Sequence, residues 1–133
     1  MKTVLVDTSA LLPFLDQDDT EHLAIVETVK HLVGDDTALI TTSYVLVETS
    51  ALVRSRLGLL AFKALGAAVD RAMEVVWVDE DLHRRAWAKA IHESKQGASL
   101  VDWVSFLAMK DLGIDHALTL DRHFRRQGFR TLP

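Results

Sequence analysis

The sequence predicts an α/β fold in which a mostly parallel sheet carries helices on both faces. The first observation is an alternation of short apolar runs with longer helical segments. The short runs are rich in Val, Ile, Leu and Thr and predict strands at residues 3–6, 38–41, 74–78 and 116–120, with a fifth, short edge strand at 129–132. The segments between them predict helices at residues 21–33, 44–57, 59–72, 81–93 and 100–112. The second observation is that Gly34, Gly58 and Gly113 stand at the ends of three of these segments, as helix-terminating glycines do. Alternation of this kind favours a parallel sheet because each crossover lays a helix on a sheet face.

Length and composition predict one globular domain spanning residues 1–133. The chain is 49% hydrophobic and 26% charged, which is ordinary for a globular protein, and no internal repeat or linker divides it. The absence of cysteine excludes disulfides, zinc–thiolate sites and thiol catalysis, and makes the cytoplasm the default location. Asp7 interrupts the apolar N-terminus, so we do not expect a signal peptide, and no apolar run reaches the roughly 18 residues of a membrane span. A net charge of −4 does not indicate a bulk electrostatic nucleic-acid binder, although basic groups can still be local.

Four carboxylates stand where ordinary packing prefers an apolar or neutral residue. Asp7 ends the apolar run at residues 4–6, and Glu48 lies inside an apolar helical stretch. Asp102 is the only charge in residues 99–109, and Asp121 follows a predicted strand. An acidic pocket built from such residues is tolerable only if a cation neutralises it. Carboxylates are hard oxygen ligands, so the pattern predicts a Mg²⁺ or Mn²⁺ site and, with it, phosphate chemistry.

A structural role competes with the metal site at each position. Asp7 is also a natural N-cap for a helix that follows the first strand, and Ser99 with Asp102 has the form of a capping box. Glu48 needs a buried hydrogen bond or an ion pair with a nearby arginine if it is not a ligand, and Asp121 also suits a turn. Asp7 and Asp121 both follow predicted strands, and ligand crevices of parallel sheets lie beyond the carboxyl ends of the strands.

The segments around these acids resemble the PIN-domain ribonucleases and, in length and layout, the VapC-type toxins of toxin–antitoxin pairs. The matching segments cover residues 4–12, 42–48, 99–102 and 118–124. The resemblance implies a parallel five-stranded sheet flanked by helices and an endoribonuclease that hydrolyses RNA phosphodiester bonds with Mg²⁺, for which Mn²⁺ can substitute. It implies that the metal-binding and catalytic acids are Asp7, Glu48, Asp102 and Asp121. It further implies auxiliary hydroxyls at Thr8 or Ser9 and at Thr119, a homodimer, and a complex with a cognate antitoxin.

Several other residues carry weaker signals. The C-terminal arginines, of which Arg122 is a candidate substrate-binding residue, are either solvated or placed to contact an RNA backbone. We interpret His123 as a surface histidine. The apolar surroundings of the three tryptophans predict core positions for Trp77, Trp87 and Trp103. The apolar segment at residues 57–69 belongs either to the core or to a partner surface.

Three other functions compete with the ribonuclease. A haloacid-dehalogenase-like phosphatase needs a second aspartate two residues after the first, and position 9 is Ser9. A receiver-like signalling module needs paired acids after the first strand and a lysine beyond the last, and neither is present. A non-catalytic PIN-like module that binds RNA or protein is disfavoured by four intact acids.

Overall fold

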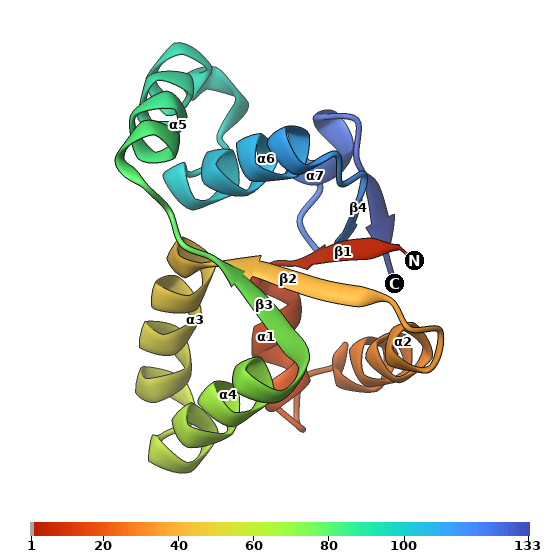
Figure 1. Cartoon of the computed structure of the whole chain (residues 1–133). Helices are drawn as coiled ribbons and strands as arrows, with labels where there is room; N and C mark the ends of the chain where they lie inside the picture. Colours follow the sequence, from red (N-terminus) through yellow and green to blue (C-terminus); the bar gives the residue numbers. More distant parts are fainter. Residues whose placement is uncertain (1) are drawn as a thin grey trace.

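The computed structural model describes residues 2–133, and it confirms the predicted α/β class (Figure 1). In chain order the elements are β1 (Thr3–Val6), α1 (Thr8–Leu15), α2 (His22–Gly34), β2 (Ala38–Thr42), α3 (Ser43–Arg56), α4 (Leu59–Ala72), β3 (Met73–Val76), α5 (Glu80–His92), a 3₁₀ turn (Ser94–Gln96), α6 (Leu100–Leu112), β4 (His116–Leu118), α7 (His123–Arg126) and β5 (Arg130–Leu132).

The five strands form one sheet of order β3-β2-β1-β4-β5, and every pairing is parallel. From β1 the chain crosses to β2 on one side, whereas β4 pairs with β1 on the other side and continues to β5. The strand order therefore reverses between β1 and β4. In open parallel sheets the crevice beyond the carboxyl ends of two such strands is the usual ligand site.

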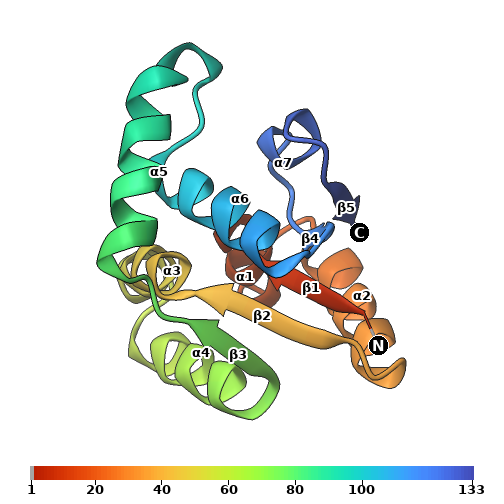
Figure 2. The ribbon, with the colours of Figure 1, turned by 45° about the horizontal axis from the view of Figure 1, so that its top comes forward.

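Alternate residues of β1 face two separate hydrophobic clusters, as the two-residue period of a strand requires. Leu5 packs into the cluster of α5, α6 and α7, while Val4 and Val6 join the cluster of α1 to α4. All three side chains are at most 2% exposed. The sheet is thus the middle layer, with α1 to α4 on one face and α5 to α7 on the other (Figures 1 and 2).

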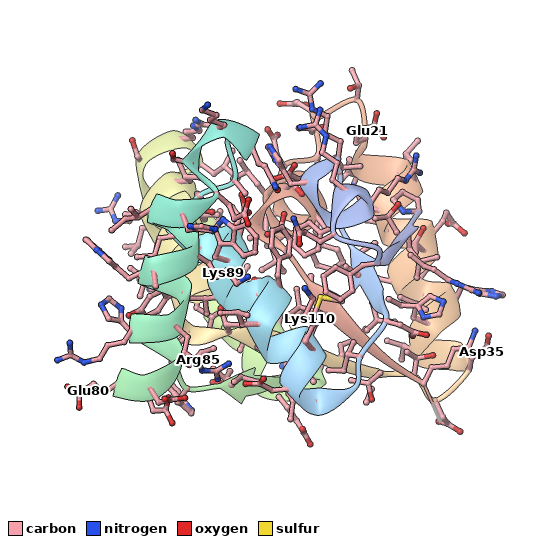
Figure 3. The ribbon with its side chains drawn as sticks, turned by 90° about the horizontal axis from the view of Figure 1, so that it is seen from above. Glu21, Asp35, Glu80, Arg85, Lys89 and Lys110 are labelled. Atoms are coloured by element: carbon pink, nitrogen blue, oxygen red, sulfur yellow. The ribbon has the colours of Figure 1, made fainter. Side chains whose placement is uncertain are left out.

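Helix α5 is attached to α6 by contacts along its length. Arg85 pairs with Asp81 of its own helix at 2.9 Å and with Asp111 of α6 at 2.6 Å. Lys89 lies 5.9 Å from the ring centre of Trp103, which is buried in α6. Figure 3 shows Arg85 and Lys89 on α5 beside the ribbon of α6. These contacts fix the direction in which α6, and the acid near its start, approaches the sheet.

Three predicted strands are shorter than expected, and one of them is β5, which begins at Arg130 rather than at Phe129. Strand β4 ends at Leu118 rather than at Leu120, so Asp121 is not the first residue after a strand. The reason is a pair of hydrogen bonds to side chains: the N–H groups of Leu120 and Asp121 donate to the hydroxyls of Ser9 and Thr119, which turns the chain out of the sheet. Strand β3 spans Met73–Val76 rather than residues 74–78.

Two short helices, α1 and α7, were not among the predicted helical segments, although α1 is the helix that the capping interpretation of Asp7 requires. Pro13 lies inside α1, where it removes one helical hydrogen bond and obscures the periodic signal. Helix α7 has four residues, too few to show a period.

The core prediction for the tryptophans is correct for Trp103 and wrong for the other two. Trp103 is 2% exposed, whereas Trp77 is 75% and Trp87 53% exposed. Trp77 follows the end of β3 at the sheet edge, and Trp87 lies on the outer side of α5. The segment at residues 57–69 is divided: Leu65 and Val69 are core, while its early apolar residues are exposed.

No helix within residues 2–133 is both long and apolar enough to cross a membrane.

Candidate metal centre

Asp7 lies at the carboxyl end of β1, between the sheet and the start of α1. Its side chain is 4% exposed. Its Oδ2 accepts hydrogen bonds from the Ser9 hydroxyl at 2.7 Å, the Thr119 hydroxyl at 3.1 Å and the Ser9 backbone N–H at 3.4 Å. The last of these is the N-cap bond of α1, so the predicted capping role is present.

The hydroxyls of Ser9 and Thr119 also connect the ends of β1 and β4. They lie 3.0 Å apart, and they accept the backbone N–H groups of Leu120 and Asp121 at 2.9 and 3.0 Å. Both strand ends are therefore held by one network centred on Oδ2 of Asp7. Because every donor to Asp7 in this network approaches the same oxygen, the orientation of the carboxyl plane is fixed.

Burial raises the pKa of Asp7 to about 6, because a desolvated carboxylate loses its hydration. The Ser9 hydroxyl opposes this rise by stabilising the charged form, and the charge of Asp102 reinforces it. Asp102 therefore lies close enough to Asp7 for the two acids to repel each other. A cation bound between them would remove both the repulsion and the desolvation penalty.

Asp102 occupies the third position of α6 and forms the predicted capping box. Its N–H donates to the Ser99 hydroxyl at 3.1 Å, and its Oδ2 accepts the Ser99 N–H at 2.9 Å. Desolvation raises the pKa of Asp102, and the charge of Asp121 raises it further. The seven residues that follow Asp102 in α6 are all buried, so Asp102 stands at the start of a core helix.

Asp121 belongs to the segment between β4 and α7. Its Oδ1 accepts the backbone N–H of His123 at 2.9 Å and lies 2.7 Å from Nδ1 of the same residue. One carboxylate oxygen of Asp102, one of Asp121 and one ring nitrogen of His123 all lie within 4.8 Å of one another.

The three aspartates share one geometrical property that suits a cation. Each has one carboxylate oxygen occupied by protein donors, which is Oδ2 in Asp7 and Asp102 and Oδ1 in Asp121. Within residues 2–133 the opposite oxygen of each accepts no hydrogen bond. The bonded oxygen fixes the carboxylate, and the free one remains available to a ligand. This donor set fits a hard divalent cation such as Mg²⁺ or Mn²⁺.

Glu48 and Thr8 lie at the junction of α1 with α3. The Thr8 hydroxyl accepts from Thr49 at 3.0 Å and is 3.5 Å from the carbonyl of Val45, so it joins the two helices. Glu48 is half-buried, and in the described part of the chain its carboxylate makes no hydrogen bond or ion pair. The ion pair with a nearby arginine, the structural alternative for Glu48, is absent there.

His123 was predicted to lie on the surface, and that prediction is wrong. Its side chain is only 19% exposed, and both ring nitrogens have partners. Its neighbour Phe124 is fully buried, which pulls the start of α7 onto the core. The sequence feature that indicates a largely buried His123 is the apolar Phe124 directly after it.

A pocket of about 280 Å³ adjoins Asp121, and its walls include Arg122, Arg125 and Thr131. The Arg125 Nε donates to the Thr131 hydroxyl at 2.8 Å. Both arginines are exposed. Positive charge beside an acidic metal site is the arrangement that binds a polyanion next to the reacting bond.

Comparison with known proteins gives a consistent result. The PIN domain family matches residues 4–130. VapC20 of Mycobacterium tuberculosis H37Rv, described as a 23S rRNA-specific endonuclease, is 33% identical over 130 residues, which are 95% of each chain. The crystal structure of VapC20, described as a toxin that cleaves the sarcin–ricin loop, aligns with a TM-score of 0.82 and 29% identity over 95% of each chain. The structure of VapBC2 from Rickettsia felis bound to promoter DNA aligns with a TM-score of 0.68 over 97% of this chain and 96% of that one. Its 10% identity makes this last likeness one of fold alone.

Proposed function

Because this chain belongs to the PIN-domain family, we propose that it is a metal-dependent endoribonuclease, the toxin of a toxin–antitoxin pair. The observation that carries the proposal is that carboxylate oxygens of Asp102 and Asp121 lie within 4.8 Å of each other, while the charge of Asp102 raises the pKa of Asp7 at the end of β1. The metal-binding acids of the proposal are Asp7, Asp102 and Asp121, with Glu48 as the fourth.

The proposed ion is Mg²⁺, with Mn²⁺ able to substitute. A divalent cation held by these acids supplies Lewis acidity: it polarises a phosphoryl oxygen and lowers the pKa of a water. The protein holds the acids in place. Ser9 and Thr119 orient Asp7 through Oδ2, and Ser99 orients Asp102 through the capping box.

The hydroxyls have roles that differ from one another. Ser9 and Thr119 contact Asp7 directly, so we propose that they fix a metal-binding carboxylate. Thr8 is bonded to α3, and we propose that it holds the helix that carries Glu48 against α1.

Arg122 and Arg125 border the pocket beside Asp121, and we propose that they bind RNA phosphates flanking the cleaved bond. Their charge offsets the acidity of the site and of the chain as a whole. Because RNA is the substrate, we also propose a cytoplasmic location. The relative VapC20 cleaves the sarcin–ricin loop of 23S rRNA, which makes that loop the first substrate to test here.

The proposed partners are a cognate antitoxin and a second copy of the chain. An apolar cavity of about 200 Å³ between α1, α2 and α4 offers an antitoxin a binding surface. On α5, Trp87 and Ile91 lie one helical turn apart and are 53% and 66% exposed, and we propose that this apolar face forms the dimer contact. Sedimentation of the purified protein and of Trp87→Glu tests the dimer: the variant should sediment as a monomer.

Cleavage of purified ribosomal RNA tests the function. We expect cuts that require Mg²⁺ or Mn²⁺, that stop with chelator, and that are lost in Asp102→Asn. If RNA is bound but never cut, and calorimetry detects no Mn²⁺ binding, the chain is a non-catalytic RNA-binding module instead.

A further inference from the structure

His123 is bonded at both ring nitrogens, and the two bonds join separate parts of the site. Nδ1 lies 2.7 Å from Oδ1 of Asp121, and Nε2 lies 3.0 Å from the backbone oxygen of Gln96. The carbonyl of Gln96 can only accept, so Nε2 carries a proton and donates it. On the other side of the ring, Nδ1 and Oδ1 of Asp121 lie within hydrogen-bond distance.

The bond between His123 and Asp121 determines which carboxylate oxygen of Asp121 remains free for a cation. Oδ1 receives the ring and also the backbone N–H of His123, at 2.7 and 2.9 Å. Two donors satisfy the two lone pairs of that oxygen. The free oxygen is therefore Oδ2, and the carboxylate cannot rotate without breaking both bonds.

The bond to Gln96 holds the segment that leads into α6. Gln96 is also bonded through its side chain, which accepts from Gln127 at 3.0 Å. Three residues later, Ser99 begins the capping box that orients Asp102. His123 thus connects one metal-binding acid directly with the segment that presents another.

The backbone of His123 is itself firmly placed. The next residue, Phe124, is fully buried, and its ring packs edge-on against Phe106 of α6 at 4.9 Å. The imidazole therefore approaches Asp121 from a fixed position rather than from a mobile surface turn.

We infer that His123 is a positioning residue, which orients Asp121 for the cation and couples it to the segment that carries Asp102. It is not a ligand, since neither ring nitrogen is free. The inference rests on the proposed metal-dependent function.

Three variants of the full chain separate the two bonds. The asparagine side chain of His123→Asn has an amide nitrogen near the position of Nδ1, so this variant keeps a donor to Asp121 and loses the bond to Gln96. His123→Gln keeps the bond to Gln96 and loses the one to Asp121, because its longer amide reaches toward the position of Nε2. His123→Ala loses both bonds. The matched control is His116→Gln: His116 also bonds a neighbouring aspartate, Asp115, and is 15% exposed, but it lies at the start of β4 and away from the acids.

The measurements are Mn²⁺ affinity by calorimetry and amide hydrogen exchange of residues 94–99. We expect His123→Ala to weaken Mn²⁺ binding about tenfold, as loss of an outer hydrogen-bond partner of a metal ligand does. His123→Asn should recover most of that affinity, and His123→Gln should not. Exchange of residues 94–99 should be faster in His123→Ala and His123→Asn and close to wild type in His123→Gln. The control should match wild type in both measurements.

Three results would overturn the inference. If His123→Ala binds Mn²⁺ as tightly as wild type, or if His123→Asn is no better than His123→Ala, the bond to Asp121 does not position a ligand, and the proposed function stands without it. If wild type itself binds no Mn²⁺, the metal-dependent function fails and this role fails with it.

Discussion

Replacing Asp7 with asparagine should make the metal-free protein more stable, although it removes a residue at the centre of the site. Burial raises the pKa of Asp7 from 3.8 to about 6. Each unit of such a shift corresponds to about 1.4 kcal/mol, so keeping this carboxylate ionised in the folded state costs about 3 kcal/mol at neutral pH. Asparagine carries no charge and avoids this cost. It also retains an oxygen for Ser9 and Thr119, and it is as good an N-cap as aspartate.

The pH dependence of this gain follows from the sign of the shift. An acid whose pKa is higher in the folded state stabilises the fold below its unfolded pKa, and that contribution disappears as the pH rises through the folded pKa. The difference between Asp7→Asn and wild type should therefore be small at pH 4, grow through pH 6, and level off above about pH 7. At its maximum of about 3 kcal/mol it raises the melting temperature by roughly 10 °C for a chain of this length.

Thermal unfolding in chelator, followed by circular dichroism between pH 4.5 and 8, measures the effect. Added Mg²⁺ or Mn²⁺ should reverse the order once the gain of wild type exceeds about 3 kcal/mol: a cation at 1,000 times its dissociation constant stabilises wild type by about 4.1 kcal/mol and the variant by much less. Asp79→Asn is the matched control, because Asp79 also caps a helix after a strand but lies outside the site. An Asp7→Asn protein that melts below wild type in chelator at pH 7.5, or a difference that does not change with pH, would refute the reasoning.

Three further changes test other parts of the site. Ser9→Ala removes a donor that stabilises the charge of Asp7, so the pKa of Asp7 should rise and the acidic limb of the pH–rate profile should move to higher pH; an unmoved limb would mean that Asp7 does not set it. Glu48→Gln should abolish cleavage in a gel assay yet change the unfolding free energy by less than about 0.5 kcal/mol, because Glu48 has no partner within residues 2–133; full activity would remove it from the proposed ligands. Arg122→Gln combined with Arg125→Gln should raise KM for RNA with kcat kept, and should reduce the slope of log KM against log salt by about 0.7 for each phosphate that is no longer bound; an unchanged slope would show that neither arginine binds the backbone.

The strands were predictable, and the acids could be singled out as candidates, because each has a local signal. A buried parallel strand is a short apolar run, and a charge at its end contradicts that run, so Asp7 stands out without any structure. Asp102 stands out for the same reason inside a buried helix. The exact end of β4 was not predictable, because it depends on the hydroxyl of Ser9, 111 residues away, which takes the N–H of Leu120.

The role of His123 could not be predicted for a related reason. Its second partner is a backbone carbonyl 27 residues earlier, which leaves no mark on residue type. The predictions for Trp77 and Trp87 were wrong in the opposite sense, because these side chains are exposed where burial was expected. Their apolar neighbours predicted burial, but an edge strand and an outer helix have faces that nothing in the described part of the chain covers.

The capping and metal-site interpretations of the aspartates compete in the sequence, whereas in the structure the two roles are compatible. A carboxylate has two oxygens, and in Asp7 and Asp102 the helix cap uses only one of them. The cap then benefits the site, since it orients the free oxygen before any ion arrives. A loss of stability on mutation therefore cannot by itself distinguish the two roles. The two roles differ in how the free energy of unfolding depends on the cation. A cap stabilises the protein equally with and without a cation. A buried carboxylate that is also a metal ligand destabilises the metal-free protein and stabilises the metal-bound one.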